Sequence, residues 1–408
     1  MALIVQKYGG TSVADLERLR NVARRVIQTR QRGHDVVVVV SAMAGHTDRL
    51  LELAREAAER PSEREVDVIL ATGEQITAGL LAIILQDMGF KARSYLGHQV
   101  RILTDSLFGR ARIKTVDSWR LIKDLREGII PVVAGFQGVD EEGNITTLGR
   151  GGSDTTAVAL AVALRADLCE IYTDVDGVYT TDPNVCEKAR KLDRISYEEM
   201  LEMASLGAKV LQIRSVEFAA KYKVPIHVRS SFSDQEGTIV CEEVEDMEKA
   251  VVSGVTYDRN QSRIELVRIP DRPGVAARLF EALSDASIPV DMIIQTSSAE
   301  GPYANLAFTV SKADFPRALE ITKGIARELG ASDVLCEEDV AKVSVVGLGM
   351  KSQPGVAFKM FKTLANEGIN IKMISTSEIK ISCVIDPKYT ELAVRALHNA
   401  FGLDREQD

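Results

Sequence analysis

The sequence predicts an α/β protein in which a domain with a largely parallel central sheet precedes two small βαββαβ modules. Two observations lead to this fold class. Up to Ser231, short apolar runs alternate with longer amphipathic patterns, which is the order of strands and helices in an α/β domain. In the last third of the chain, one sequence unit occurs twice in the same register.

Five apolar runs of the first domain are expected to form buried strands: 3–5, 36–40, 129–134, 169–172 and 226–228. Because these runs are apolar throughout, they indicate a sheet that is covered on both faces. An amphipathic pattern at 16–33 predicts the first helix, with Asp15 as its N-terminal cap. Its apolar face consists of Leu16, Leu19, Val22, Val26 and Ile27.

A segment at 233–249 marks the expected end of this domain; it contains a short strand at 237–241 and is acidic after that strand. An ordinary solvent-exposed loop would have the same composition, and a linker between two domains is a loop of this kind at a domain boundary. We therefore expect three domains, at residues 1–246, 247–337 and 338–408.

The repeat contains a Pro-Gly turn, because the sequence PGVA at 273–276 recurs at 354–357, an offset of 81 residues. At that offset the matching apolar pairs are Phe280 and Phe361, Leu283 and Leu364, Ile288 and Ile369, Val290 and Ile371, and Met292 and Met373. Each unit reads as strand, turn, helix, two strands and helix, which is typical of a ferredoxin-like module.

Composition restricts the class of protein. A net charge of −9 leaves no basic surface for nucleic acid, so an anionic ligand must be bound locally by loops and a few cations. The five cysteines are scattered, without a CxxC pair or a Cys/His cluster, which argues against a zinc site or a disulfide scaffold. No signal peptide and no apolar stretch of about 20 residues is recognised, so we expect a cytoplasmic protein without a membrane span.

A lysine and two glycines directly follow the first strand, as Lys7, Gly9 and Gly10. Glycines let the backbone approach a ligand, free N–H groups can hold phosphate oxygens, and a lysine can neutralise phosphate charge. The alternative is a simple turn with a surface lysine. The segment is not a GxxxxGK[ST] loop, which excludes a P-loop enzyme.

A second glycine-rich segment, TLGRGGSDTT at 147–156, leads into an apolar helix expected at 157–164. Free N–H groups and the helix dipole favour an anion there, and Arg150 could bind a carboxylate through two hydrogen bonds. Ser153 or Asp154 could instead only cap the helix, although a cap does not require Arg-Gly-Gly before it.

A third segment, YTDVDGVYTTDP at 172–183, follows the strand at 169–172. Asp-Gly also signals a tight hairpin turn, but ligands of α/β domains bind at the carboxyl ends of strands. Its Thr and Asp side chains could hold a nucleoside, and Tyr179 could pack on it. Three weaker signals, each also compatible with a structural role, are SAM at 41–43, TGE at 72–74 interrupting a helical stretch, and GAK at 207–209.

Together these strings resemble the aspartate kinases. KYGGTSV, SAM, TGEQ, LGRGGSDTTA, YTDVDGVYTTDP and GAKVL occur in the order of that family over essentially the whole chain, and the two repeats resemble ACT domains. RGGSD is shared with other amino acid kinases, but the combination is specific. The resemblance implies an amino acid kinase-type sandwich that transfers phosphate from ATP to the β-carboxylate of L-aspartate. The product would be 4-phospho-L-aspartate, the entry to lysine, threonine and methionine.

The resemblance also implies the site residues. Those for ATP are Lys7, Tyr8, Gly9, Gly10, Thr173, Asp174, Tyr179, Lys209 and Val210. Those for aspartate are Ser41, Thr47, Glu74, Arg150, Gly151, Gly152, Ser153 and Asp154. Lys7, Asp154 and Lys209 would be catalytic, with Lys209 on the β- and γ-phosphates. Glu74 would pair with the substrate ammonium and Arg150 with its α-carboxylate. Mg²⁺ would be held mainly by ATP oxygens, with no metal site on the protein.

The physical problem of this reaction is repulsion between two anions, because the attacking carboxylate is already ionised and needs no strong base. Catalysis should therefore come from in-line positioning and from cations and N–H groups around the transferring phosphoryl.

For the two repeats, the resemblance implies amino-acid binding between ACT units and assembly of a homo-oligomer through them. The implied residues are Asp271, Arg272, Pro273, Gly274, Val275, Ala276, Asp291, Gln295, Val356, Ala357, Asn370, Ile371, Ser377 and Glu378. We expect feedback inhibition by threonine, lysine or both together, and the alternative is that the repeats serve only dimerisation. Met247 could be an internal start that yields a regulatory β subunit and an α2β2 assembly, or an ordinary residue of a linker.

Two other functions are compatible with parts of the sequence. Another carboxylate kinase of the same fold, such as an N-acetylglutamate kinase, fits less well with KYGGTSV and two ACT units. A non-catalytic amino-acid sensor would require broken phosphate motifs, and these motifs look intact.

Overall fold

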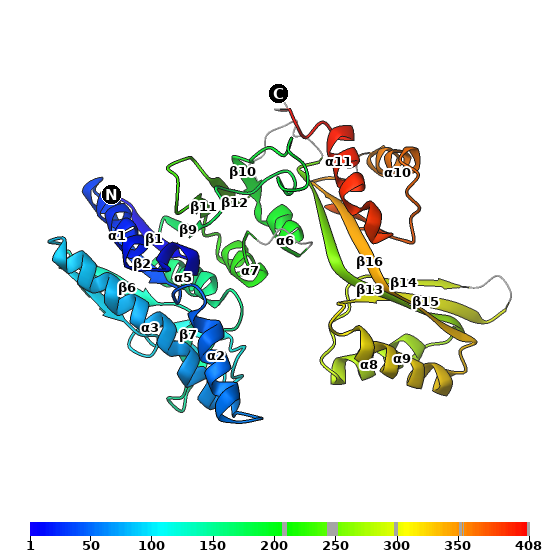
Figure 1. The fold of residues 1–408 in the computed structure, drawn as a ribbon, viewed down its shortest axis with the longest axis horizontal. Coiled ribbons are helices and arrows are strands. Elements are labelled where there is room, and N and C mark those ends of the chain that lie inside the picture. Colours follow the sequence, from blue (N-terminus) through cyan, green and yellow to red (C-terminus); the bar gives the residue numbers. More distant parts are fainter. Residues whose placement is uncertain (206–209, 243–251, 298–300, 351–352, 354, 406–408) are drawn as a thin grey trace. The chain divides into compact units, whose positions relative to one another are not determined.

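The computed structural model describes residues 1–205, 210–242, 252–297, 301–350, 353 and 355–405 (Figure 1). The chain divides into two compact units. The first contains Met1–Val178, Lys191–Ala204 and the described part of 209–246. The second contains Tyr179–Arg190 and the described part of 247–408. Each unit has its own sheets and its own hydrophobic core.

An eight-stranded sheet lies at the centre of the first unit, in the order β10-β12-β11-β9-β1-β2-β6-β3. Its strands are β1 (Leu3–Tyr8), β2 (Asp35–Val40), β3 (Ala92–Tyr95), β6 (Ile130–Ala134), β9 (Leu168–Thr173), β10 (Arg194–Ser196), β11 (Ile226–Ser230) and β12 (Thr238–Cys241). Every neighbouring pair is parallel except β11 with β12. The prediction of a largely parallel sheet is confirmed, and the five predicted strands all belong to it.

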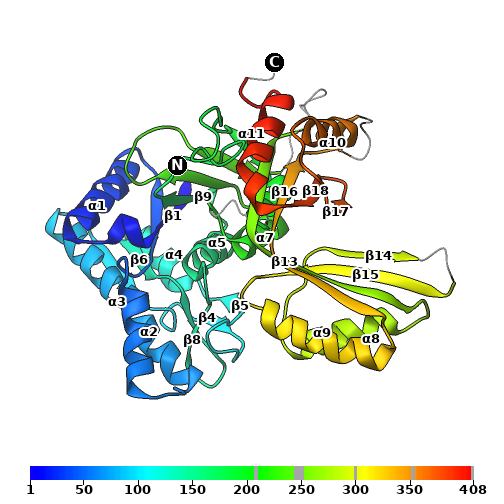
Figure 2. The same cartoon turned by 45° about the vertical axis from the view of Figure 1, so that its right-hand side comes forward.

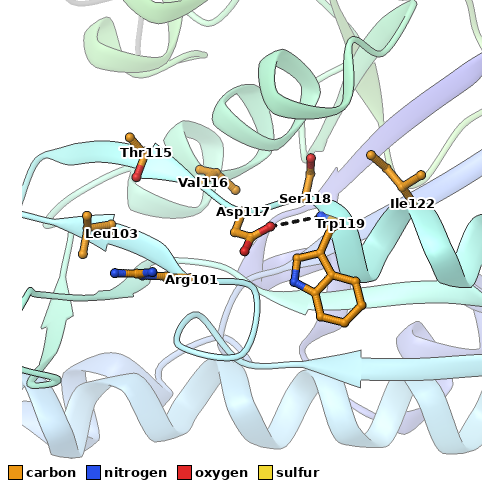
Figure 3. Close-up of a pocket in the computed structure, with 8 residues that line it drawn as sticks. All are labelled: Arg101, Leu103, Thr115, Val116, Asp117, Ser118, Trp119 and Ile122. Carbon is orange, nitrogen blue, oxygen red and sulfur yellow. Dashed lines mark hydrogen bonds between the residues drawn. The ribbon is translucent and has the colours of Figure 1, made fainter.

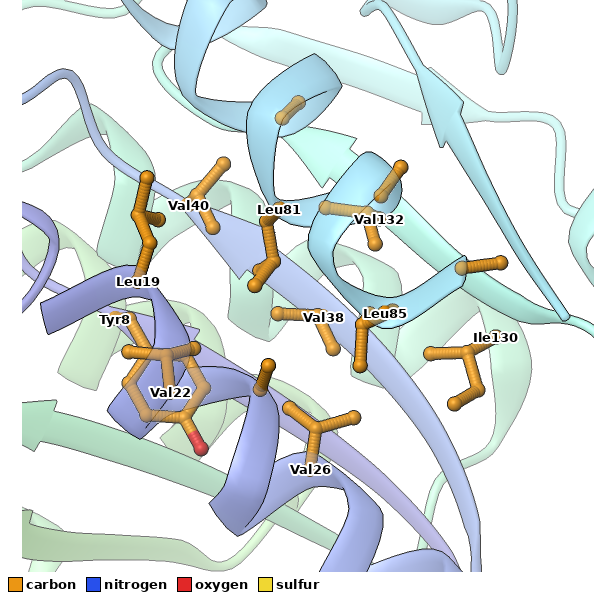
Figure 4. Close-up of a cluster of buried hydrophobic side chains, with 14 of the residues drawn as sticks. Tyr8, Leu19, Val22, Val26, Val38, Val40, Leu81, Leu85, Ile130 and Val132 are labelled. Atoms are coloured by element: carbon orange, nitrogen blue, oxygen red, sulfur yellow. The ribbon is translucent and has the colours of Figure 1, made fainter. Parts of the chain in front are cut away.

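Helices cover both faces of this sheet. Helices α1 (Leu16–Gln31) and α3 (Glu63–Asp87) share one face, where Val22, Leu81 and Leu85 pack against Val38 and other strand residues (Figure 4). Asp15 caps α1 as predicted, because its carboxylate accepts a hydrogen bond from the backbone N–H of Arg18 at 2.8 Å. Helix α5 (Gly152–Leu164) contacts β1 and β9 and packs beside α7 (Ile213–Tyr222).

The remaining elements of this unit include α2 (His46–Ala57), α4 (Trp119–Arg126), α6 (Tyr197–Ser205) and the short helix η1 (Gly10–Val13). A four-stranded sheet has the order β5-β4-β7-β8. Its strands are β4 (Ile102–Thr104), β5 (Ile113–Val116), β7 (Gln137–Val139) and β8 (Ile145–Thr147).

Helix α3 corrects two expectations. An 18-residue stretch within it has a mean hydropathy of 1.9, so by length and composition alone it could cross a membrane, contrary to the expectation that the sequence contains no such stretch. Half of that stretch is buried inside the structure, and its apolar residues pack on the sheet as part of the core. Thr72, Gly73 and Glu74 do not interrupt the helix, because α3 is continuous from Glu63 to Asp87.

The second unit has a six-stranded sheet in the order β14-β15-β13-β16-β18-β17. Its strands are β13 (Gly254–Pro270), β14 (Ile293–Ser297), β15 (Tyr303–Val310), β16 (Asp333–Val346), β17 (Met373–Thr376) and β18 (Lys380–Ile385). Its helices are α8 (Val275–Asp285), α9 (Phe315–Leu329), α10 (Val356–Asn366), η2 (Pro387–Tyr389) and α11 (Thr390–Ala400). Figure 2 shows α8 and α9 side by side along the strands β13 to β15.

The repeat is visible in the elements, since both bounds of α8 recur in α10 at the offset of 81 residues. The two modules are nevertheless not independent. The start of β13 pairs with the end of β16, from Gly254 opposite Val346 to Asp258 opposite Lys342. Val252 and Val255 pack in the core of the second module although in sequence they lie at the start of the first module. Both long strands thus run through both modules.

Residues Tyr179–Arg190 also pack in the second unit, although the sequence placed them inside the first domain. The backbone N–H of Val255 donates to the carbonyl oxygen of Thr180 at 2.7 Å, and the hydroxyl of Thr180 lies 2.9 Å from Nε2 of His398. The hydroxyl of Tyr257 donates to Asp182 at 2.8 Å. We call this segment the strap.

Candidate active site

Three of the predicted segments meet where β1, β2 and β9 end. The backbone N–H of Gly9 donates to the carbonyl oxygen of Tyr172 at 3.2 Å, and that of Ser41 donates to Tyr8 at 3.1 Å. A Cβ atom on Gly10 would lie 3.0 Å from the carbonyl oxygen of Ala42, so a side chain there would press on the backbone. The glycine turn after β1 is therefore fixed between the ends of its two neighbouring strands.

Lys7 is held by an ion pair at this turn. Its Nζ lies 2.5 Å from Oδ1 of Asp154, in the first turn of α5, and each side chain is only 11% exposed. A Cβ atom on Gly9 would be 3.5 Å from the same Nζ, so the ammonium lies directly beside the glycine turn. The charge of Lys7 is thus compensated by a partner near the helix N-terminus.

Tyr8 differs from its neighbours, because its side chain points to the opposite face of the sheet. The ring is fully buried and stacks on Tyr172 with centroids 4.6 Å apart and planes 10° apart. Its hydroxyl donates to Gln6 at 3.2 Å, and burial raises its pKa well above the ordinary value. Of the nucleotide role predicted for Tyr8, only a backbone contact is compatible with this orientation.

Glu74 on α3 has one carboxylate oxygen bound and one free. Oε1 accepts a hydrogen bond from the backbone N–H of Ala42 at 3.0 Å, whereas the buried Oε2 has no hydrogen-bond partner among the described residues. The residue is 3% exposed, and burial raises its pKa from 4.5 to about 7. Gly73 permits this approach, because a Cβ atom there would lie 2.8 Å from Cβ of Ala42. The free oxygen can receive a cationic group such as an ammonium.

The segment before α5 depends on its glycines. Gly149 and Gly151 have φ values of 75° and 70°, the left-handed region that favours glycine. A Cβ atom on Gly151 would lie 1.8 Å from Cγ of Gln212, and one on Gly152 would lie 2.8 Å from the ring of Phe136. Helix α5 begins at Gly152, five residues earlier than the sequence suggested, so Ser153 and Asp154 are buried in its first turn.

Arg150 is exposed, and no ion pair joins it to any described residue. Thr47 lies in the first turn of α2 and is partly buried. Val210 is partly buried, whereas Lys209 lies outside the residues that the structure describes.

The residues predicted for the nucleoside fall in both units. Thr173 ends β9, and its hydroxyl donates to the exposed carboxylate of Asp174 at 3.0 Å. Tyr179 begins the strap and so belongs to the second unit.

Comparison with known proteins places this chain. The amino acid kinase family model matches residues 2–230, and an ACT domain model matches 267–323 and 343–401. An aspartate kinase of Stutzerimonas stutzeri is 56% identical over 99% of this chain and 98% of its own length. An aspartokinase of Mycolicibacterium smegmatis is 50% identical over 100% of this chain and 98% of its own length. The chain belongs to the aspartate kinase family.

Solved structures agree with this assignment. Aspartokinase III of E. coli in complex with aspartate and ADP has a TM-score of 0.81 at 30% identity, covering 98% of this chain and 99% of that one. The same enzyme with lysine and aspartate has a TM-score of 0.78 at 30% identity, with the same coverage. The chain is thus an aspartate kinase with an amino acid kinase domain followed by ACT domains.

In the ACT part of this aspartate kinase, several predicted effector residues lie at the helix starts. Gly274 and Gly355, which precede α8 and α10, have φ values of 94° and 110°. Asp271 accepts a hydrogen bond from the hydroxyl of Ser297 at 3.0 Å. The hydroxyl of Ser377 accepts backbone hydrogen bonds from Ile379 and Lys380 at 3.3 and 3.2 Å.

Asp291 and its repeat counterpart, Lys372, carry opposite charges and both pair with strand β16. Asp291 forms an ion pair with the buried Lys342, and Lys372 forms one with Glu337. Between these pairs, Met292, Met373 and Val340 pack in one small cluster. The two modules of the kinase are therefore joined by apolar and ionic contacts, and one of these residues, Asp291, is among those predicted for effector binding.

The two cavities of the first unit that are described lie away from the predicted residues. One, of about 520 Å³, lies between β4, β5 and the start of α4 and is shown in Figure 3. Its lining consists of Arg101, Leu103, Thr115, Val116, Asp117, Ser118, Trp119 and Ile122. The other, of about 630 Å³, is lined by residues around Met1, Gly33 and Leu125. Neither contains a residue predicted for ATP or aspartate.

Sequence reasoning missed two charged residues next to the site, Asp67 and Arg214. Asp67 is fully buried in an otherwise apolar part of α3, and Arg214 is half-buried on α7. A carboxylate at a core position of a helical pattern was the available signal, since such groups are buried only when they have partners.

Proposed function

We propose that this aspartate kinase transfers the γ-phosphoryl group of ATP to the β-carboxylate of L-aspartate and forms 4-phospho-L-aspartate. The observation that carries the proposal is the meeting of the glycine turn, the Lys7–Asp154 pair, the Glu74–Ala42 contact and the start of α5 at the ends of β1 and β2. At these strand ends, one cation (Lys7) and the glycine turn lie in the same region as the Glu74 carboxylate, whose Oε2 has no hydrogen-bond partner among the described residues.

Each group then has a role set by its charge. Lys7 and the backbone N–H of Gly10 stabilise the phosphates, since they are placed before the reaction begins. The N–H of Gly9 is already bonded to Tyr172, so Gly9 contributes by letting the backbone approach the nucleotide closely. The free oxygen of Glu74 pairs with the ammonium of aspartate, and the exposed guanidinium of Arg150 binds the α-carboxylate. Lys209 and Val210, Thr173, Asp174 and Tyr179 complete the ATP site, and Ser41, Thr47 and the first turn of α5 complete the aspartate site.

We propose that Mg²⁺ accompanies ATP, where it would neutralise charge on the phosphate oxygens. The described residues contain no group of three or more His, Cys, Asp or Glu side chains that could hold a metal ion.

A direct test compares aspartate and N-acetylglutamate as substrates, with ATP and with hydroxylamine to trap the acyl phosphate. Hydroxamate should form with aspartate only. The Glu74→Gln variant should lose most of this activity, because its amide cannot compensate the substrate ammonium. Equal activity with N-acetylglutamate would reject aspartate as the specific substrate.

We further propose feedback inhibition by lysine, threonine or both at the interface of the ACT units, for a kinase that supplies lysine, threonine and methionine in the cytoplasm. The relative of 30% identity that was solved with lysine supports an amino-acid effector. Activity should be measured with threonine, lysine, methionine and each pair of them. Full activity in every mixture would leave the modules with a role in assembly alone.

Assembly is proposed to occur through the ACT units, with domains at 1–246, 247–337 and 338–408. Met247, which lies outside the described residues, is proposed as an internal start that yields a β subunit for an α2β2 complex. A Western blot with a C-terminal tag should then show a second, short band, and a Met247→Leu variant should lack it. A single full-length band in the wild type would remove the idea.

A further inference from the structure

Asp67 binds two separate segments of the first unit. Its Oδ2 accepts the backbone N–H of Thr147 at 2.7 Å, and its Oδ1 accepts the hydroxyl of Thr147 at 2.6 Å. Both oxygens also lie 3.0 Å from the backbone nitrogen of Gly109. The carboxylate is fully buried, and burial raises its pKa, while the hydrogen bonds from Thr147 and Gly109 oppose this rise. All of its described partners are donors.

Arg214 binds the same two segments through their acceptors. One guanidinium nitrogen donates to the carbonyl oxygen of Leu148 at 2.6 Å, and the other donates to that of Ala111 at 3.0 Å. The segments also bind each other directly, since the N–H of Ala111 donates to Thr147 at 2.9 Å. An anion on α3 and a cation on α7 therefore hold residues 109–111 and 147–148 together. We call these two residues the clamp.

The clamp lies next to the substrate groups along the chain. Asp67 precedes Glu74 by seven residues, which is two helical turns, so both side chains lie on the same face of α3. Thr147 and Leu148 directly precede the glycine loop that contains Arg150. The single rigid helix that carries the carboxylate proposed for the substrate ammonium thus also holds the base of the loop proposed for the α-carboxylate.

We propose that Asp67 and Arg214 are positioning residues for aspartate, which fix the spacing between Glu74 and Arg150 by holding the base of the 149–152 loop. This inference rests on the proposed function for those two substrate contacts. Neither clamp residue needs to touch aspartate or ATP. Loss of the clamp lets the Arg150 loop shift relative to α3, which weakens a bidentate contact without removing any group from the site.

If the clamp had only a structural role, its loss would lower stability and would not change KM for aspartate more than KM for ATP. A positioning role predicts a larger change in KM for aspartate. In Asp67→Asn the new NH₂ group faces the backbone N–H of Gly109 in either orientation of the amide, because that N–H donates to both oxygens of Asp67. In Arg214→Gln the guanidinium, whose two NH groups bind both carbonyl oxygens, is lost. Each variant should raise KM for aspartate about tenfold, the equivalent of one charge-assisted hydrogen bond, and change KM for ATP less than about twofold. Arg214→Lys, which keeps the charge and loses the fork, should lie between Arg214→Gln and the wild type.

The matched control is Asp124→Asn. Asp124 is also a buried carboxylate of the first unit, where it binds Arg93 and accepts a 2.7 Å hydrogen bond from the hydroxyl of Tyr95. Among the described residues, no hydrogen bond or ion pair joins it to the loop at 147–152. Asp124→Asn should lower the thermal midpoint as Asp67→Asn does and leave KM for aspartate unchanged.

The experiment measures both KM values, kcat and the thermal midpoint for the full-length variants, together with Arg150→Met. A selective rise in KM for aspartate in Asp67→Asn and Arg214→Gln supports the clamp. If Asp67→Asn does not fold, Arg214→Gln and Arg214→Lys decide alone. Unchanged KM values, or equal changes in both KM values and in Asp124→Asn, overturn it. If Arg150→Met leaves KM for aspartate unchanged, the proposed contact between Arg150 and the substrate is rejected. If Arg150→Met raises KM for aspartate and the clamp variants do not, only the clamp is rejected.

Discussion

Glu74 should give this kinase a pH dependence that can be worked out from its surroundings. Burial raises its pKa from 4.5 to about 7, against hydrogen bonds from the backbone of Ala42 and of Glu74 itself. The rise corresponds to roughly 3 kcal/mol in favour of the neutral acid. A group with this pKa is about nine-tenths ionised at pH 8 and about one-tenth ionised at pH 6. Because only the carboxylate can pair with an ammonium, kcat/KM for aspartate should fall about tenfold between pH 8 and pH 6.

The sign of the effect differs between binding and stability. Bound aspartate brings its ammonium to Glu74 and lowers the pKa, so kcat should change less than kcat/KM over the same range. The free energy of unfolding should decrease as the pH rises from about 4.5 to about 7, because the unfolded chain there releases a proton that the folded chain retains.

The assay is kcat/KM for aspartate at saturating ATP, in steps from pH 6 to pH 8, with kcat/KM for ATP as the internal comparison. Glu74→Gln should have a value about 10- to 100-fold lower at pH 8, the loss of one charged hydrogen bond, and a flat profile. A flat wild-type profile would refute the reasoning, and so would a Glu74→Gln profile with the wild-type slope.

Three further predictions concern other parts of the chain. Lys7→Ala should abolish turnover and leave binding of lysine or threonine intact in calorimetry, and an active Lys7→Ala variant would contradict the site. Asp154→Asn should lower kcat at least about tenfold because it removes the counter-charge of Lys7. Gly151→Ala should inactivate the enzyme, since its Cβ atom would overlap Gln212. Gly143 also has a positive φ, of 87°, but open space around it, so Gly143→Ala should cost only about 1–2 kcal/mol of stability in urea unfolding. Equal losses of activity in the two variants would contradict the role of the loop at 149–152 in the site. Burial lowers the pKa of His398, so stability should rise with pH through the range just below 6.5, where the unfolded chain binds a proton that the folded chain does not. His398→Gln should flatten this part of a urea-unfolding profile measured from pH 5 to pH 7.5, and an unchanged slope would assign the effect to another group.

The parts of the fold that follow local patterns could be predicted from the sequence. The apolar runs of β1, β2, β6, β9 and β11 and the cap of α1 at Asp15 are set by residues close in sequence. The repeat predicted α8 and α10 in matching registers, since equivalent residues form equivalent helices. The association of the glycine turn with the ends of neighbouring strands followed from the parallel sheet.

What could not be predicted depends on partners distant in the chain. Gly73 suggested a break in α3, but its small size serves contact with Ala42, a neighbour 31 positions away. The strap was assigned to the first domain because its sequence continues the motif after β9, whereas its hydrogen bonds are to Val255, Tyr257 and His398. The clamp was missed because a lone buried aspartate has no motif, and its four contacts come from Gly109 and Thr147.

The long strands β13 and β16 make the regulatory region indivisible at its midpoint. A fragment that began at residue 338 would lack Gly254–Asp258, so one side of β16 would have no hydrogen-bonded neighbour there. A chain that ended at residue 337 would instead leave the start of β13 as an unpaired strand edge. A chain that began upstream of Val252 would keep every strand pair of the six-stranded sheet. A product that started at Met247 would therefore keep these strand pairs of both modules, but it would lack the strap that hydrogen-bonds Val255, Tyr257 and His398.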